Sequence, residues 1–246
     1  MSGATLNDAV LSVDDLCAFY GAAQILYGLS LEVRRGEVVA LMGRNGAGKT
    51  TTMKAIMGLI ARTGRVRFNG IDISRARPYE IARLGVGFTP EDRRIFADLT
   101  VMENLDVGRQ PPRVFADGTP APHWTPERLF ALFPNLRDMP DRFGGQMSGG
   151  EQQMLTVART LMGNPLLVLL DEPSEGVAPL IVEQMANTIA ELKQQGLSIL
   201  LSEQNLHFAG LVADRVYLLE KGEIRWQGTM AALAADADLQ RSYLTM

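Results

Sequence analysis

Residues 38–50 read VVALMGRNGAGKT, an apolar run followed at once by a glycine-rich loop. Residues 43–50 match the P-loop pattern, in which a strand leads into the loop and a helix follows it. The glycines let backbone N–H groups turn inward around a phosphate, and the N-terminus of the following helix favours negative charge. These residues therefore predict a phosphate-binding loop in an α/β protein.

The side chains of this loop are expected to have separate tasks. Lys49 is expected to reach the β- and γ-phosphates of a nucleotide, and the Thr50 hydroxyl is expected to hold Mg²⁺. The candidate nucleotide-binding residues of the loop are Gly43, Arg44, Asn45, Gly46, Ala47, Gly48, Lys49, Thr50 and Thr51.

A second candidate site element is the apolar run LLVLL at residues 166–170, which ends in Asp171 and Glu172. In open α/β sheets, ligands bind at the carboxyl ends of the strands. Asp171 is expected to hold Mg²⁺ and Glu172 to orient or deprotonate the attacking water. Taken alone, an apolar strand that ends in two acids is as compatible with a structural role for those acids as with a functional one. The P-loop upstream favours the functional role.

A third element is MSGGEQ at residues 147–152, which precedes a helical pattern of apolar residues. Ser148 followed by two glycines is compatible with a simple helix N-cap. The same arrangement also forms a second helix N-terminus able to bind an anion.

Composition limits the class of protein. The chain has 246 residues, 46% of them hydrophobic and 21% charged, with a formal net charge of −4. These values are typical of a globular protein, and the slightly acidic balance argues against nucleic acid as a partner bound by bulk charge. A single cysteine excludes an internal disulfide. The N-terminal segment MSGATLNDAV lacks the features of a signal peptide, so we expect a cytoplasmic protein.

Hydrophobic periodicity and turn residues predict alternating strands and helices. The first two strands read as an antiparallel start, and a mainly helical insert is expected at about residues 75–160. The runs LLVLL at 166–170 and SILLS at 198–202 are apolar along their centres with no polar alternation, which indicates parallel strands covered on both faces. Strands are expected at 11–19, 25–33, 37–42, 64–68, 86–89, 166–170 and 198–202, helices at 78–84, 101–107, 126–133, 150–162, 180–194 and 206–213, and a hairpin at 215–226.

The order GRNGAGKT, MSGGEQQ, LLVLLDEPSEG resembles the ATPase subunit of ATP-binding-cassette (ABC) transporters over essentially the whole chain. Within that family, the stretches YGAAQILYGLSLEVRRGEVVALMGRNGAGKTT, TPEDRRIFADLTVMENL, EPSEGVAPLIVEQM and LLSEQN are similar to the ATPases of branched-chain amino-acid importers and of urea or short-chain amide importers. The resemblance implies one ABC ATPase domain over residues 5–246. Its P-loop NTPase fold would combine a mainly parallel core sheet, an antiparallel β subdomain and a helical subdomain.

The resemblance also implies roles for individual residues. Tyr20 would stack on adenine, and Glu91 would join Thr50 and Asp171 around Mg²⁺. Gln204 would stand beside the γ-phosphate and act in catalysis with Glu172. Most ABC ATPases carry Gln at the position of Glu91 and His at that of Gln204.

Two ATPase subunits of this family close head to tail, so the signature residues of one would bind the γ-phosphate held by the other. Those residues are Ser148, Gly149, Gly150 and Glu151, the last standing where most members have Gln. Residues 174–177 would form the loop that links the two active sites.

The resemblance implies a Mg²⁺-dependent ATPase on the inner face of the plasma membrane, bound there to ABC permease subunits. It would energise uptake of branched-chain or other amino acids, which a periplasmic binding protein would deliver. A second ATPase subunit, either identical to this chain or related to it, would complete the dimer. Glu175 and Val177 stand where we expect Leu in amino-acid importers, which keeps urea or short-chain amides open as solutes. A lipid or lipopolysaccharide exporter and a non-transport ATP-gated cassette are further alternatives.

Overall fold

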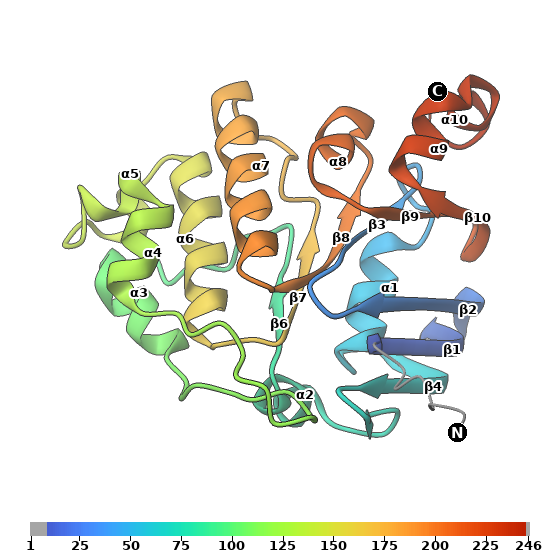
Figure 1. The fold of residues 1–246 in the computed structure, drawn as a ribbon, viewed down its shortest axis with the longest axis horizontal. Coiled ribbons are helices and arrows are strands. Elements are labelled where there is room, and N and C mark those ends of the chain that lie inside the picture. The colour runs from blue at the N-terminus through green and yellow to red at the C-terminus, as the bar shows by residue number, and fades with distance from the viewer. Residues whose placement is uncertain (1–8, 245–246) are drawn as a thin grey trace, which may run out of the picture.

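The computed structural model describes residues 9–244. Residues 5–8 and 245–246 of the expected domain, and most of the N-terminal segment MSGATLNDAV, lie outside the described residues. The described chain folds into two β-sheets with helices packed against them (Figure 1).

The smaller sheet is antiparallel, with strand order β2-β1-β4-β5, and confirms the antiparallel start predicted from the sequence. Its two long strands pair with each other from Ala9 to Tyr20, so each extends beyond the predicted bounds. The strands of this sheet are β1 (Ala9–Tyr20), β2 (Ala23–Arg34), β4 (Ala61–Phe68) and β5 (Ile71–Asp72).

The larger sheet has the order β10-β9-β3-β8-β7-β6 and is parallel except at β10. The hairpin predicted at 215–226 is confirmed by the antiparallel pair β9 and β10. The strands are β3 (Val38–Met42), β6 (Val86–Thr89), β7 (Leu167–Asp171), β8 (Ser198–Glu203), β9 (Arg215–Glu220) and β10 (Glu223–Thr229).

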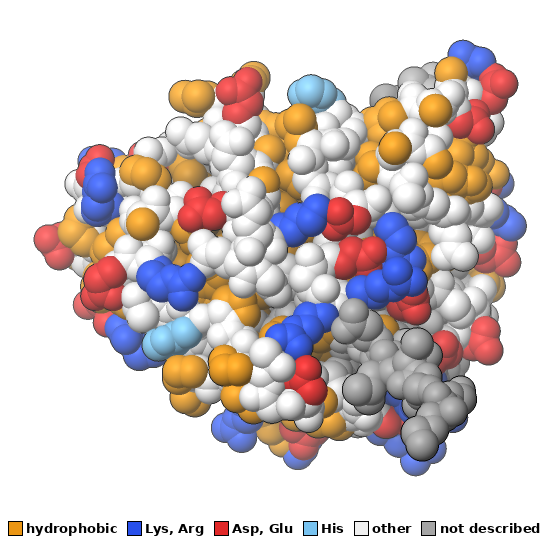
Figure 2. All heavy atoms as spheres, viewed as in Figure 1, with side chains coloured by type: hydrophobic (Ala, Val, Ile, Leu, Met, Phe, Trp, Pro, Cys, Tyr) orange, Lys and Arg blue, Asp and Glu red, His pale blue; other side chains and the backbone are white. Residues whose placement is uncertain are grey.

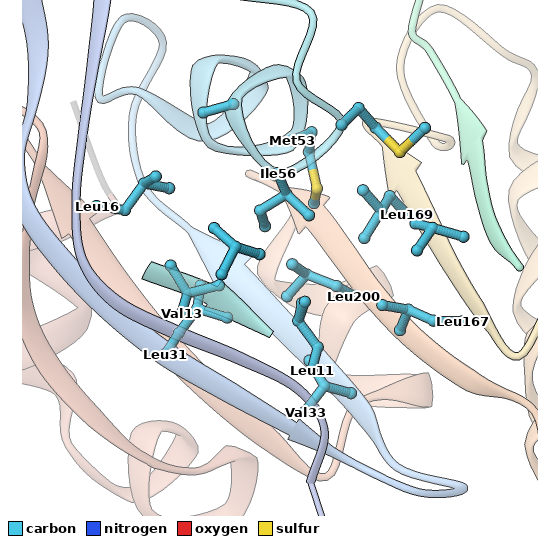
Figure 3. Close-up of a cluster of buried hydrophobic side chains, with 14 of the residues drawn as sticks. Leu11, Val13, Leu16, Leu31, Val33, Met53, Ile56, Leu167, Leu169 and Leu200 are labelled. Carbon is cyan, nitrogen blue, oxygen red and sulfur yellow. The ribbon is translucent and has the colours of Figure 1, made fainter. Parts of the chain in front are cut away.

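Both faces of β7 are buried, as its uninterrupted apolar sequence predicts. Leu167 and Leu169 join the cluster between the two sheets, with side chains from β1, β2, α1 and β8 (Figure 3). Val168 and Leu170 belong to the cluster on the opposite face, which includes residues of α6 and α7. Burial of each such side chain contributes about 1.5–3 kcal/mol, so the two clusters hold the central strands in place.

The helices α3 to α6 gather beside the β6 edge of the larger sheet (Figure 1). Thr125 caps α4 by accepting a hydrogen bond from the backbone N–H of Arg128. The helices are α1 (Lys49–Ile56), α2 (Pro78–Leu84), α3 (Val101–Gly108), α4 (Pro126–Leu132), α5 (Pro134–Arg137), α6 (Gly149–Met162), α7 (Pro179–Gln194), α8 (Leu206–Val212), α9 (Met230–Ala235) and α10 (Ala237–Tyr243), with a 3₁₀ turn at Gly144–Gln146.

Strand β6, predicted at 86–89, lies inside the stretch 75–160 and belongs to the larger sheet, so the helices beside that sheet begin at α3. The division into a core and a helical subdomain stays a prediction. Helices α9 and α10 were not predicted; Met230 and Leu233 of α9 pack into a third cluster with β3 and β9.

The described helices include none that is long and apolar enough to cross a bilayer. Acidic and basic side chains are interspersed over the face shown in Figure 2.

Candidate active site

The P-loop connects β3 to α1, as predicted, and two of its glycines are required by its shape. Gly48 has φ +113°, a conformation that side-chain-bearing residues rarely adopt, and a Cβ there would lie 2.9 Å from Leu26. A Cβ at Gly43 would lie 2.3 Å from the carbonyl oxygen of Leu219 at the end of β9. The loop can therefore pass this close to β9 only with glycine at both positions.

The β9–β10 turn is hydrogen-bonded both to the P-loop and to β2 of the smaller sheet. The backbone N–H of Gly222 donates to the Ala47 carbonyl at 2.9 Å, and the Gly222 carbonyl accepts from Tyr27 N–H at 3.0 Å. The turn is thus fixed between the P-loop and β2.

Lys49 and Glu172 form a buried ion pair at the centre of the site. Lys49 Nζ lies 3.0 Å from Glu172 Oε1, and the two side chains are 3% and 6% exposed. The same ammonium group donates to the carbonyls of Gly43 at 2.9 Å and Arg44 at 3.2 Å. The P-loop cation and the acid at the end of β7 therefore meet at one point.

Thr50 and Asp171 also meet, because the Thr50 hydroxyl donates to Asp171 Oδ1 at 3.1 Å. Within residues 9–244, the other carboxylate oxygen of Asp171, Oδ2, is buried without a hydrogen-bond partner. Burial raises the pKa of the Asp171 carboxyl above its usual value. A hydroxyl beside an unpartnered carboxylate oxygen is a donor set that suits Mg²⁺, so these residues fit the predicted metal.

Gln204 stands directly beside the acid proposed to activate water. Its Nε2 atom donates to Glu172 Oε2 at 3.3 Å. Glu172 is held by its backbone N–H, which donates to the Ser202 carbonyl at 3.0 Å, and it adopts the left-handed conformation with φ +47°. The end of β8 thus orients both residues.

A hollow of about 460 Å³ brings most of the predicted nucleotide-binding residues together. Tyr20 stands at its rim with 45% of its surface exposed, as an aromatic stacking platform requires. Gly43 and Arg44 reach the same place through their carbonyl contacts with Lys49. The lining residues are Tyr20, Ile25, Asn45, Gly46, Gly48, Lys49, Thr50, Thr51, Glu91, Glu172 and Glu175.

The signature residues are placed elsewhere, at the N-terminus of α6. Ser148 and Glu151 form a capping box, in which Glu151 Oε2 accepts from Ser148 N–H at 2.7 Å and Ser148 Oγ accepts from Glu151 N–H at 3.4 Å. In the described part of the chain, residues 148–151 do not line the P-loop hollow. The helix-cap interpretation is therefore correct for Ser148, and its contact with nucleotide across a dimer stays a prediction.

Sequence reasoning missed two acidic residues as parts of this site. Glu175 lines the hollow, and a hydrogen bond with Glu172, partial burial and the nearby charges of Glu172, Glu91 and Glu203 raise its pKa to about 7. Glu203 is buried at the end of β8, and burial raises the pKa of its carboxyl. Glu203 ends an apolar strand just as Asp171 does. That shared pattern is the sequence signal that marks Glu203 as a candidate site residue.

The fold and the P-loop together define a P-loop nucleotide-binding protein of the α/β class. Residues 26–175 match the ABC transporter family. The chain is 40% identical over 236 residues to the high-affinity branched-chain amino acid transport ATP-binding protein BraG of Pseudomonas aeruginosa, covering 96% of this chain and 99% of that protein. It is 33% identical over 239 residues to the lipopolysaccharide export system ATP-binding protein LptB of Escherichia coli K12, covering 96% and 97%.

Solved structures agree with these sequence matches. A nucleotide-free ATP-binding cassette from an ABC transporter superposes with a TM-score of 0.77 at 27% identity, covering 94% of this chain and 97% of that one. An ATP-binding subunit of an ABC transporter superposes with a TM-score of 0.75 at 29% identity, covering 96% of each chain. The chain therefore belongs to the ABC transporter family, as an ATP-binding cassette of the kind that couples ATP hydrolysis to transport.

Proposed function

We propose that this chain is the ATP-hydrolysing subunit of an importer that takes up branched-chain or other amino acids through a separate permease. The observation that carries this proposal is the 40% identity to BraG over nearly the full length of both chains. The identity to LptB is lower, at 33%.

Binding of ATP begins at the P-loop. The loop amides and Lys49 would hold the β- and γ-phosphates, and Tyr20 would stack on the adenine. Thr50, Asp171 and Glu91 would hold Mg²⁺, which neutralises negative charge on the phosphates when it is bound. Phosphate oxygens compete with Glu172 for Lys49, because the ammonium group already pairs with that carboxylate. Nucleotide binding thereby releases Glu172 to act on water.

Hydrolysis then depends on residues at the ends of β7 and β8. Glu172 would orient the attacking water and accept its proton, and Gln204 would donate a hydrogen bond to a γ-phosphate oxygen. Ser148, Gly149, Gly150 and Glu151 would complete the site of a second ATPase subunit in a head-to-tail dimer. Dimer closure would drive the permease from the inner face of the plasma membrane, with a periplasmic binding protein delivering the solute.

The identity to LptB supports a second candidate, the ATPase of a lipopolysaccharide exporter. Solute uptake in the source organism separates the two. A chromosomal Glu172→Gln strain is expected to lose uptake of labelled leucine, isoleucine and valine, while a strain with the exposed Glu191 changed to Gln takes them up normally.

Three outcomes would contradict amino-acid import. Normal uptake of all three amino acids with loss of urea or acetamide uptake assigns the chain to an amide importer. Normal uptake with loss of surface lipopolysaccharide assigns it to export. Normal amino-acid uptake, normal urea and acetamide uptake and normal surface lipopolysaccharide together overturn all three transport candidates.

A further inference from the structure

Glu203 connects two loops that flank the proposed active site. It is the last residue of β8 and is 1% exposed. Its Oε1 accepts hydrogen bonds from the backbone N–H groups of Gln204 and Asn205, both at 2.9 Å. Its Oε2 accepts from the hydroxyl of Ser174 at 2.7 Å. One carboxylate therefore fixes the segment that carries Gln204 and the loop that follows Glu172.

These bonds belong to a continuous polar network through the site. Lys49 contacts Glu172 Oε1, and Gln204 contacts Glu172 Oε2. The backbone of Gln204 is held by Glu203, which in turn holds Ser174. A shift of the loop at residue 174 would move Glu203 and, through it, the amide that contacts the proposed base.

We propose that Glu203 is a positioning residue for ATP hydrolysis, which sets Gln204 against Glu172 and couples that contact to the loop at Ser174. Glu203 reaches Lys49 only through Glu172 and Gln204, and it is not among the residues that line the P-loop hollow within the described chain. It therefore acts on the rate of hydrolysis and not on nucleotide affinity.

The geometry shows which substitution preserves the arrangement. In Glu203→Gln, the amide oxygen can accept the same two backbone N–H groups, and the amide nitrogen can donate to the Ser174 hydroxyl. In Glu203→Ala all three bonds are lost, and in Ser174→Ala only the bond between the loops is lost. The three variants differ in which hydrogen bonds of Glu203 they keep. Together they separate a positioning role of Glu203 in hydrolysis from a role in stability alone.

The test measures steady-state MgATP hydrolysis by the purified chain, and binding of a non-hydrolysable ATP analogue by calorimetry. Glu203→Ala is expected to lower kcat about ten-fold or more, because Gln204 is then no longer held against Glu172 and that one hydrogen bond is weakened or lost. Analogue affinity and the binding stoichiometry should stay at wild-type values, which excludes a loss of folded protein. Glu203→Gln should stay within about three-fold of wild type, because its hydrogen bonds are kept.

A double-variant cycle tests the coupling to the loop. Ser174→Ala should slow the wild type but have no further effect in the Glu203→Ala background, because the two residues share one contact. Additive effects on kcat, a Glu203→Gln variant as slow as Glu203→Ala, or unchanged kcat in Glu203→Ala would each overturn the proposal.

The inference rests on the proposed role of Glu172, so Glu172→Gln is measured in the same assay. Normal hydrolysis by Glu172→Gln would overturn the proposed active site itself. Loss of hydrolysis in Glu172→Gln together with normal kcat in Glu203→Ala would overturn only the role of Glu203.

Discussion

Lys49 Nζ lies 3.0 Å from Glu172 Oε1, and both side chains are buried. The cation that is proposed to bind phosphate therefore holds the carboxylate that is proposed to activate water. Each group satisfies the other's charge away from solvent, where an unpaired charge is costly. When Lys49 binds phosphate, it is thus expected to give up its ion pair with Glu172, which frees that carboxylate to act as the base.

Lys49→Ala is expected to abolish ATP turnover, because the β- and γ-phosphates lose their main side-chain partner. It should also destabilise the nucleotide-free chain, since removing one partner of a buried ion pair costs about 3–5 kcal/mol. Denaturant unfolding and an ATPase assay measure the two effects. Lys54→Ala, on the same helix but outside the hollow, should leave turnover within two-fold of wild type.

The stability effect has its own control. In the double variant Lys49→Ala/Glu172→Gln the buried charge is gone, so the free energy of unfolding should recover much of what Lys49→Ala lost. A double variant as unstable as Lys49→Ala alone would show that the ion pair does not account for the loss.

Gln204→Ala is expected to slow turnover roughly ten- to hundred-fold, because a hydrogen bond to a charged acceptor contributes about 1.5–3 kcal/mol. ATP affinity should change little if the contact with phosphate forms only in the closed dimer. Gln204→His should retain activity and add an acidic limb to the pH profile near the histidine pKa of ~6.5.

Steady-state assays with the exposed His207 changed to Ala as a control decide the role of Gln204. An alanine variant at position 204 with turnover within two-fold of wild type would reduce Gln204 to a surface residue at the strand end.

Ser148→Arg is expected to block turnover without weakening ATP binding to the monomer, because the signature acts on nucleotide held by the other subunit. Mixing Ser148→Arg with Lys49→Ala in a dimer of two copies leaves one composite site with both elements intact. Partial recovery of ATPase activity in the mixture supports this arrangement. Loss of nucleotide affinity by the Ser148→Arg monomer would instead place the signature in its own subunit's site.

The pH dependence of stability reports on Glu175, whose pKa is raised to about 7 by its hydrogen bond with Glu172, partial burial and neighbouring acids. Because the pKa is raised on folding, protonated Glu175 stabilises the folded chain at low pH, and this contribution is lost as pH rises through about 7. Glu175 remains exposed to solvent on part of its surface, so the effect on stability is expected to be small.

Thermal melting of the nucleotide-free, magnesium-free chain from pH 5 to 8 measures this effect. Glu175→Gln, which cannot ionise, should gain stability relative to wild type as pH rises through that window. Parallel melting curves for the two proteins over the whole range would refute the assignment.

Much of the fold could be predicted because local signals and tertiary packing agree. The apolar runs of β7 and β8 have no polar alternation, and both strands are buried on both faces. Helix α2 matches its predicted bounds because Pro78 begins it and Gly85, at φ +113°, ends it. Helices α9 and α10 have six and seven residues, and α9 is held by contacts of Met230 and Leu233 that no local pattern reveals.

The candidate site could be predicted as a set of residues but not as a set of contacts. Strand β8 lies between β3 and β7, and this order places Gln204 beside Glu172. The left-handed backbone of Glu172 turns its side chain back to Lys49, and a non-glycine residue gives no sequence signal for that conformation. The sequence marks Glu203 as an acid at the end of an apolar strand, but its contact with the Ser174 hydroxyl depends on another loop and could not be predicted.

The central claim is that Glu172 activates water at a site where Lys49 binds the phosphates, and Glu172→Gln tests it most directly. The measurement is ATP hydrolysis together with ATP binding on the same preparation. General bases contribute about 10²–10⁴-fold, so hydrolysis should fall at least about 100-fold while binding is retained and an ATP-trapped dimer appears on size exclusion. Hydrolysis within a few-fold of wild type would contradict the account.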